Sequence, residues 1–369
     1  MTINIASSHR FHLLDLAREL ERCGHKVRFY SYVPTKRAVK FGLKRECSYS
    51  LFFFTIPFLC LIKLSKSAFW AIKLNQIVLD YYLAWFMKPC DVYIALGTVY
   101  KKSFLSAKKK FGATTILEWG SKHIEEQQLI LNKISGVKKQ PYYFTKRSIE
   151  GYVLADYIAI PSDHVKQSFI ERGINEKKLI QNPYGVDLSM FKPTELDKND
   201  AYDLIMVGGW SYRKGCDILI ELCRQNNFRL LHIGSIVDIA FPNLPNMTHI
   251  DAVDQSLLIN YYAKARVFVL PSREEGMAMV QAQALACGLP IVCSKNTGGS
   301  DLRDFLDDKK WIIEMQELTE DELARCIKQA LDLAYKQQGL RSYSDKVVTQ
   351  LTWEAYMKRY DENLTKISH

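Results

Sequence analysis

Long uncharged apolar segments are missing from this chain of 369 residues. A membrane-spanning helix needs a run of about 18 such residues, and lysines interrupt the most hydrophobic stretch, residues 49–88, before it reaches that length. The first residues, MTINIASSHR, lack the basic start and apolar core of a signal peptide. The sequence therefore predicts no spanning helix and no secretory leader, and we expect a cytoplasmic protein.

Signals for metal sites and disulfides are also absent. The nine cysteines are an odd number, and none of them forms a Cys-x-x-Cys pair, which is typical of reduced thiols. No Asp-x-Asp motif is present, so we expect neither a metal ion nor another cofactor. Internal repeats and low-complexity tracts are missing, while 48% hydrophobic and 24% charged residues are typical of a globular protein.

Charge is distributed unevenly along the chain. Residues 1–185 contain 29 basic and 14 acidic residues, a net charge of +15, whereas the remainder contains 21 and 26, a net charge of −5. A strongly basic half favours a polyanionic partner. No compact nucleic-acid-binding motif is present, so we expect an anionic membrane surface and no nucleic acid.

Short apolar runs that alternate with amphipathic segments predict parallel sheets of the doubly wound kind. We expect strands at 3–6 and 26–30 on either side of a helix at 11–23, which ends at Gly24. In the second half we expect strands at 204–208, 228–234 and 247–250. A chain of this length accommodates two such domains.

The most informative segment is residues 267–301, VFVLPSREEGMAMVQAQALACGLPIVCSKNTGGSD. It contains a predicted strand at 267–270, a charged turn, a helix at 277–286 that ends at Gly288, a strand at 291–293 and a Gly-Gly turn. Ligands of parallel sheets bind beyond the carboxyl ends of the strands, where helix N-termini point. We therefore expect this segment to hold a phosphate-bearing ligand.

This segment resembles the signature of family 4 glycosyltransferases of the GT-B fold, which reads roughly P-S-x-x-E-G-x-x-x-x-x-x-E-A-x-A-C-G-x-P-V. Residues 154–193 also resemble the family, with its N-G-V-D-x-x-x-F-x-P pattern near their end. The residues in register with the signature are Pro271, Ser272, Glu275, Gly276, Ala284, Ala286, Cys287, Gly288 and Pro290.

The resemblance implies an α/β protein with the GT-B fold, in which two Rossmann-like doubly wound domains face each other across a cleft. We expect an N-terminal, acceptor-side domain over residues 1–185, joined by a crossover helix at 352–369. A C-terminal domain over 186–351 would bind the nucleotide sugar, and the extended linker at 183–193 would act as a hinge.

The resemblance also assigns residues to the donor. Lys214 would hold the diphosphate with Arg213, because Gly209 stands where the family has an arginine. Glu275 would bind the hydroxyls of the sugar, and Gln283, which replaces a family glutamate, would bind the ribose. The other expected donor-binding residues are Gly208, Gly209, Val253, Gly276, Met277, Ala278, Gly298 and Gly299.

The first domain resembles the family less closely. Relatives carry an active-site histidine after the strand that we expect at 115–117, and here Glu118 and His123 are the candidates. Together with Glu275 and Lys214 they form the expected catalytic set.

Two other features of the first domain bear on the acceptor. On the acceptor side, Ser8, His9 and Arg10 replace the family's Gly-Gly loop. Residues 49–88 allow two interpretations, which we hold as true in part: a pair of core helices, or an interfacial segment whose lysines meet anionic headgroups.

The resemblance implies a retaining, metal-independent glycosyltransferase that moves a hexosyl or related group from a UDP- or GDP-sugar to an oligosaccharide or lipid-linked acceptor. The basic, aromatic first half suggests an acceptor at the inner face of the cell membrane, and hence bacterial surface polysaccharide synthesis, such as that of lipopolysaccharide O-antigen or capsule. Two alternatives stay open: a non-catalytic GT-B protein that binds a nucleotide sugar or glycan, and a sugar-nucleotide epimerase.

Overall fold

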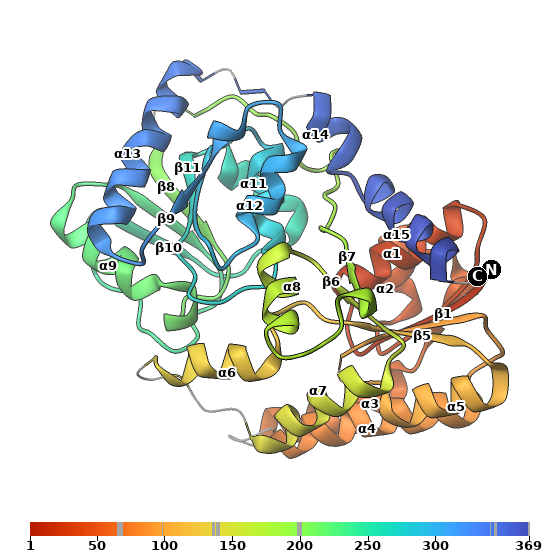
Figure 1. Ribbon diagram of the computed structural model, residues 1–369. Helices are drawn as coiled ribbons and strands as arrows, with labels where there is room; N and C mark the ends of the chain where they lie inside the picture. Colours follow the sequence, from red (N-terminus) through yellow and green to blue (C-terminus); the bar gives the residue numbers. More distant parts are fainter. Residues whose placement is uncertain are drawn as a thin grey trace.

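The computed structural model describes residues 1–64, 69–97, 99–134, 137, 141–197, 201–339, 341–342 and 345–367 (Figure 1). The side chains of residues 59, 61–64 and 69 lie outside this description. The described elements form two open sheets with helices on both faces (Figure 1). None of the described helices combines the length and the apolarity needed to cross a membrane.

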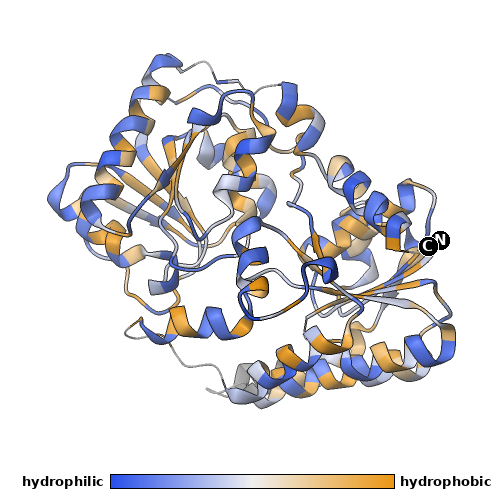
Figure 2. Ribbon diagram, in the orientation of Figure 1, coloured by the Kyte–Doolittle hydropathy of each residue, from blue (hydrophilic) through white to orange (hydrophobic). Residues whose placement is uncertain are grey.

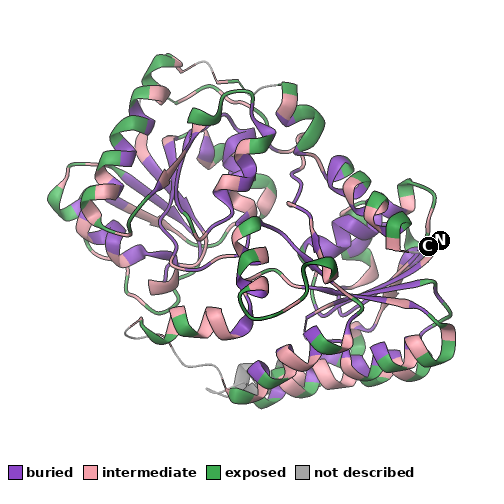
Figure 3. Cartoon of the chain, viewed as in Figure 1, coloured by how far each residue is buried: buried purple, intermediate pink, exposed green. Residues whose placement is uncertain are grey.

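The first domain is built on a parallel sheet whose described strands lie in the order β3-β2-β1-β4-β5-β6-β7. Its central strands β1, β4, β5 and β6 are largely buried, and β4 and β6 are continuous apolar runs, whereas the edge strands β3 and β7 are partly exposed (Figures 2 and 3). The strand bounds are β1 Thr2–Ser7, β2 Lys26–Ser31, β3 Ser48–Ser50, β4 Val92–Leu96, β5 Thr114–Glu118, β6 Tyr157–Ile160 and β7 Leu179–Gln181.

The helices of this domain lie in two layers, and the predicted opening helix is confirmed as α1, Phe11–Arg22. Gly24 has φ of +95°, a conformation that favours glycine and that turns the chain back toward β2. The other helices are α2 Thr35–Lys40, α3 Phe52–Leu64, α4 Phe69–Phe86, α5 Lys101–Phe111, α6 Ile124–Asn132, α7 Tyr142–Leu154 and α8 Asp163–Ile170.

Helices α3 and α4 account for the aromatic stretch at 49–88. Helix α4 buries Leu79 and Leu83 but leaves Trp85 73% and Phe86 66% exposed, and Phe53 of α3 is 81% exposed. The stretch therefore has one face in the core and an exposed aromatic face. Of the lysines predicted to meet headgroups, Lys66 and the side chain of Lys63 lie outside the described residues.

The second domain repeats the plan with strand order β10-β9-β8-β11-β12-β13, again parallel in the described part. Its strands are β8 Tyr202–Val207, β9 Leu230–Ile233, β10 Met247–Ile250, β11 Ala265–Leu270, β12 Ile291–Ser294 and β13 Ile312–Met315. Its helices are α9 Cys216–Gln225, α10 Leu258–Tyr262, α11 Met279–Ala286, α12 Gly299–Leu302, α13 Glu320–Lys336 and α14 Asp345–Gln350.

The last helix, α15 Trp353–Ile367, leaves the second domain and packs against α1 of the first domain (Figure 1). Two extended segments cross between the domains side by side, as the parallel bridge between Val186 and Thr352 shows. The predicted architecture of two doubly wound domains with a crossover helix is therefore confirmed.

Candidate active site between the two domains

Loops that follow strands of both sheets touch at the interface between the domains. Gly276, after β11, packs so closely on Gly120, after β5, that a Cβ atom at 276 would overlap the carbonyl oxygen of Gly120. Ser162 Oγ of the first domain donates to the carbonyl oxygen of Gly276 at 2.8 Å. Glycine is required at position 276 because two backbones meet there, and both domains contribute to one site.

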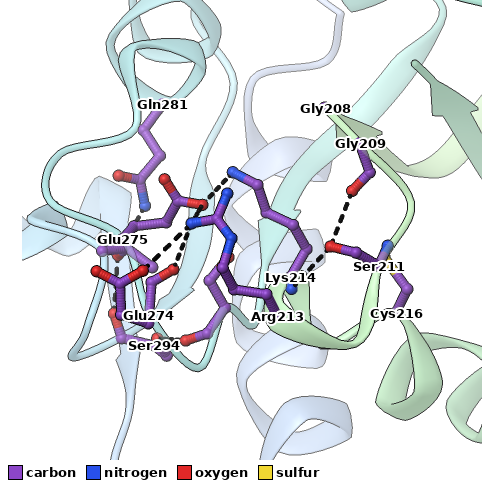
Figure 4. A network of polar contacts seen from close by, with 12 residues as sticks. Gly208, Gly209, Ser211, Arg213, Lys214, Cys216, Glu274, Glu275, Gln281 and Ser294 are labelled. Atoms are coloured by element: carbon purple, nitrogen blue, oxygen red, sulfur yellow. Dashed lines mark hydrogen bonds and ion pairs between the residues drawn. The ribbon is translucent and has the colours of Figure 1, made fainter. Parts of the chain in front are cut away.

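Arg213 and Lys214 follow β8 and converge on the carboxylate of Glu275 (Figure 4). Arg213 Nη1 is 2.7 Å from Glu275 Oε1, and Lys214 Nζ forms an ion pair with the same oxygen. The side chain of Glu275 is 13% exposed, so this charge cluster is mostly withdrawn from solvent. The structure thus brings the two predicted phosphate-binding cations into contact with the predicted sugar-binding carboxylate.

Glu274 is a fourth member of this cluster, and no sequence pattern singled it out. It is fully buried, with Oε2 3.4 Å from Arg213 Nη1 and 3.2 Å from Gln127 Nε2 of α6. Among the described residues, none forms a hydrogen bond with its Oε1. Burial raises the pKa of the Glu274 carboxyl, and Arg213 acts against that shift.

The charge state of Arg213 follows from the same neighbours. Burial lowers the pKa of its guanidinium, but the carboxylates of Glu275 and Glu274 outweigh burial and the pKa is raised. Arg213 is therefore a fixed cation that is balanced by carboxylates until another anion takes their place.

Side chains of the first domain fix the loop that carries Glu275. His164 Nε2 donates to the carbonyl oxygen of Glu275 at 2.8 Å, and Lys122 Nζ donates to Asn296 Oδ1 at 3.0 Å. Burial lowers the pKa of His164 to about 4, so the ring is neutral near pH 7 and Nε2 carries the proton that it donates. The position of Glu275 thus depends on contact between the domains.

A cavity of about 410 Å³ opens beside this loop, at the carboxyl ends of β4 and β5. Its wall is mostly aromatic and aliphatic with a few polar groups, the usual character of a small-molecule site. The lining residues include Phe11, His12, Glu118, Trp119, Tyr184 and Met277.

Glu118 is the polar centre of the cavity wall. His12 Nε2 is 3.0 Å from Glu118 Oε2, and the hydroxyl of Tyr360 in α15 donates to Glu118 Oε1 at 2.7 Å. The ring of His12 also lies 4.4 Å, centroid to centroid, from that of Tyr184. The crossover helix therefore positions a predicted catalytic residue, and His12 and Tyr360 are site residues that the sequence did not reveal.

His123, the other predicted catalytic candidate, lies apart from this cavity. It precedes α6, and its Nδ1 accepts a hydrogen bond from the backbone of Glu125 at 3.4 Å. Its ring packs on Tyr152 and Phe169 at centroid distances of 4.8 and 5.2 Å, and burial lowers its pKa. The structure gives His123 a helix-capping position and does not bring it to Glu275.

Most of the other predicted donor-binding residues surround the Glu275 cluster. Gly208, at φ of +137°, lies over the end of the Lys214 side chain, and Gly298, at φ of +72°, packs on the carbonyl oxygen of Gly276. Gly299 begins α12. The predicted helix at 277–286 begins only at 279, because Met277 lines the cavity and Ala278 is extended. Gly209 precedes the Arg213–Lys214 turn, and Val253 lies partly buried in the loop after β10.

Gln283 and the acceptor-side loop lie differently from the expectation. Gln283 is buried in α11, where its Oε1 accepts from the hydroxyl of Tyr262 at 3.4 Å. Ser8 Oγ pairs with His9 Nδ1 at 2.9 Å, while the Arg10 guanidinium stacks on the ring of Phe41 at 3.6 Å. A ribose role for Gln283 and an acceptor role for residues 8–10 stay predictions.

Comparison with known proteins relates the second domain to a family of glycosyltransferases. Residues 201–332, which hold Arg213, Lys214 and Glu275, match the sequence model of the family described as Glycosyl transferases group 1. This part of the second domain is therefore similar to group 1 glycosyltransferases. An uncharacterized glycosyltransferase of Methanocaldococcus jannaschii is 26% identical to the chain over 185 residues, which are 48% of each protein. The match thus spans about half the length of that curated relative.

Solved glycosyltransferase structures share the fold over the whole chain. Sucrose-phosphate synthase of Thermosynechococcus elongatus superposes with a TM-score of 0.71 and 16% identity, covering 100% of this chain and 99% of that one. Anabaena HepE, in complex with UDP and glucose, superposes with a TM-score of 0.65 and 14% identity, covering 99% of both chains. At these identities the likeness shows the fold alone, and that fold is the expected GT-B arrangement.

Proposed function

We propose that this protein is a retaining glycosyltransferase that transfers a sugar from a UDP- or GDP-sugar to a glycan or lipid-linked acceptor. The observation that carries the proposal is the pairing of Arg213 and Lys214, which follow β8, with Glu275, which follows β11. Breaking the glycosyl bond leaves a nucleoside diphosphate, whose charge two cations and helix N-termini can stabilise. The group 1 family match and the UDP complex of the HepE neighbour support this donor class.

In this mechanism the donor diphosphate takes the place of the Glu275 carboxylate on Arg213 and Lys214. The displaced carboxylate then accepts hydrogen bonds from the hydroxyls of the donor sugar and supports the positive charge that develops on it. Backbone N–H groups at Gly298 and Gly299 would approach the phosphates, since neither position has a Cβ atom. The bond from the sugar to the phosphate breaks, a bond from the sugar to the acceptor oxygen forms, and the acceptor hydroxyl gives its proton to the departing diphosphate oxygen. We propose that no metal ion is needed.

We propose that the acceptor enters the cavity lined by Phe11, Trp119 and Tyr184, where aromatic rings suit the apolar face of a sugar. Glu118 is hydrogen-bonded to Nε2 of His12, and through this ring it would orient the acceptor hydroxyl. His12 and Tyr360 are both hydrogen-bonded to Glu118, so the three side chains act as one positioning unit.

The exposed aromatic face of α3 and α4 supports a membrane location for the acceptor. Trp85, Phe86 and Phe53 are among its exposed side chains, and Lys73 of α4 stacks on Tyr143 of α7. Aromatic side chains at the lipid interface together with nearby lysines favour an anionic leaflet. We therefore propose a peripheral enzyme at the inner face of a bacterial cell membrane, acting in surface polysaccharide synthesis such as that of lipopolysaccharide O-antigen or capsule.

The membrane proposal has its own test. We expect the protein to sediment with vesicles of anionic phospholipid at low salt and less with neutral vesicles. Replacing both Trp85 and Phe86 with serine should reduce sedimentation, whereas Leu257→Ser, at an exposed position of the second domain, should not. Equal sedimentation of all three proteins, or none with either vesicle, would exclude a membrane-docking face on α3 and α4.

Turnover tests the transferase itself. Purified protein incubated with UDP- and GDP-sugars, with and without a lipid-linked acceptor, should release nucleoside diphosphate, and Glu275→Ala should abolish release while the protein stays folded. Glu221→Ala, at a half-exposed glutamate of α9, is the matched control and should keep full activity. Full activity of Glu275→Ala would overturn the site assignment.

Two observations favour a second candidate function, a non-catalytic protein that binds a nucleotide sugar or glycan. Gly209 replaces the arginine of the family pattern, and the amide oxygen of Gln283 accepts a hydrogen bond from Tyr262. Tight binding of a nucleotide sugar without release of nucleoside diphosphate in the turnover assay would favour this function.

A further inference from the structure

A group of potential metal ligands lies where the crossover helix meets the first domain. Cys23 Sγ, His25 Nε2 and one carboxylate oxygen of Asp361 all lie within 4.8 Å of one another. Within the described part of the chain, no other site brings together three potential ligand atoms from His, Cys, Asp or Glu. The group is separate from the Arg213, Lys214 and Glu275 cluster.

Local backbone structure holds two of these ligands side by side. Cys23 caps the end of α1, and His25 precedes β2, with Gly24 at φ of +95° between them. Backbone hydrogen bonds from Gly24 to Glu21 and from His25 to Leu20, at 3.0 and 3.1 Å, close this turn. The two side chains therefore project from a rigid turn.

The third ligand comes from the other end of the chain. Asp361 lies in α15, where its Oδ1 accepts from His25 Nε2 at 2.8 Å and its Oδ2 from Cys23 Sγ at 3.9 Å. Lys358, on the preceding turn of α15, is paired with Glu354 at 2.8 Å. Cys23 is exposed, and the side chains of His25 and Asp361 are 12% and 30% exposed, which leaves a path from solvent for an ion.

We propose that Cys23, His25 and Asp361 bind a zinc ion, with water as the fourth ligand. A thiolate, an imidazole and a carboxylate form a ligand set that suits zinc, whereas magnesium and calcium prefer oxygen ligands alone. Ligand atoms around tetrahedral zinc are about 3.3–3.7 Å apart, so small side-chain rotations from the present separations suffice. Binding releases the Cys23 Sγ proton to solvent, and the neutral His25 ring moves its proton from Nε2 to Nδ1, so that the Nε2 lone pair can bind the ion.

A zinc ion here would tie the crossover helix to the first domain. Asp361 follows Tyr360, whose hydroxyl donates to Glu118 in the cavity. Fixing α15 at Asp361 therefore also fixes a contact of the candidate active site. The proposal goes beyond sugar transfer and does not depend on it, since its test reads metal binding directly.

Cobalt is a suitable probe, because a cobalt–thiolate bond gives a charge-transfer absorption band. We expect chelator-treated, full-length protein to develop this band with one equivalent of Co²⁺, and Zn²⁺ to abolish it. Cys23→Ser should lack the band, while Cys60→Ser, at another exposed cysteine, should retain it. Asp361→Asn should weaken Zn²⁺ binding at least about tenfold, since even loss of an outer partner of a ligand weakens binding by about that much.

Thermal unfolding gives a second measurement. Zn²⁺ should raise the unfolding midpoint of the wild type and of Cys60→Ser, but not that of Cys23→Ser. Absence of the cobalt band in the wild type, its persistence in Cys23→Ser, or equal Zn²⁺ affinity of the wild type and Asp361→Asn would each overturn the proposal.

Discussion

Replacing Glu275 with glutamine should have opposite effects on nucleotide binding and on sugar transfer. The substitution keeps the size of the side chain but removes the charge that Arg213 Nη1 meets at 2.7 Å and that Lys214 Nζ also contacts. In the free wild-type protein, this carboxylate competes with the donor diphosphate for both cations. The variant lacks that internal competitor.

The size of the effect follows from the bonds that are lost. A hydrogen bond to a charged group contributes about 1.5–3 kcal/mol, so nucleoside diphosphate should bind Glu275→Gln about 10- to 150-fold more tightly, at about 1.4 kcal/mol per tenfold. Leaving Lys214 without this carboxylate, and Arg213 with Glu274 as its remaining carboxylate, should lower the free energy of unfolding by about 3 kcal/mol. Transfer should fall by about 10²–10³-fold, because the sugar loses a charged partner in the transition state.

Titration calorimetry with UDP and GDP, thermal unfolding and the turnover assay measure these three quantities on one set of proteins. Glu221→Gln makes the same chemical change at a half-exposed position of α9 and should match the wild type throughout. Unchanged or weaker binding of both nucleotides by Glu275→Gln would refute the idea that the carboxylate occupies the diphosphate site.

Three further predictions concern contacts around the site. Tyr360→Phe removes the 2.7 Å hydrogen bond to buried Glu118, so the free energy of unfolding in urea should fall by about 1–3 kcal/mol. Gly276→Ala should separate the domains and abolish transfer, because its Cβ would overlap the carbonyl oxygen of Gly120. A crystal structure or small-angle scattering measures the domain packing, and unchanged packing would contradict this prediction. Burial raises the pKa of Asp301 to about 6. Its folded pKa therefore lies above the unfolded value, and the wild type should lose about 2–3 kcal/mol of stability, relative to Asp301→Asn, as pH rises from about 4 to 6; a constant difference would contradict this.

The sequence predicted those parts of the fold that depend on local patterns. The segment at 267–301 carries its strand, turn, helix and Gly-Gly signals within one short stretch, and the structure contains them as β11, α11, β12 and the turn before α12. The strands β11 and β12 are slightly longer than predicted, and α11 begins two residues later than predicted, since Met277 lines the cavity and Ala278 is extended.

The parts of the site that sequence patterns missed are built from distant residues. His12, Glu118 and Tyr360 come together from α1, β5 and α15, and no spacing within one segment predicts such a contact. His123 was a catalytic candidate because it lies shortly after the strand where relatives carry an active-site histidine, but its ring packs between Tyr152 and Phe169, away from Glu275.

The zinc proposal illustrates the same limit. A search for Cys-x-x-Cys pairs detects only metal ligands that are close together in the sequence. It cannot detect ligands from distant segments that folding brings together. Cys23 and His25 meet Asp361 only because α15 crosses back to α1.

The central claim is that Arg213 and Lys214 bind the donor diphosphate, and titration of UDP and GDP into wild type and Lys214→Met tests it most directly. Lys328→Met, at an exposed position of α13, is the matched control. We predict that at least one nucleotide binds the wild type and the control equally well, and binds Lys214→Met about 10- to 150-fold more weakly. Equal affinity of all three proteins for the nucleotide that binds, or no binding of either nucleotide to the wild type, would contradict the account.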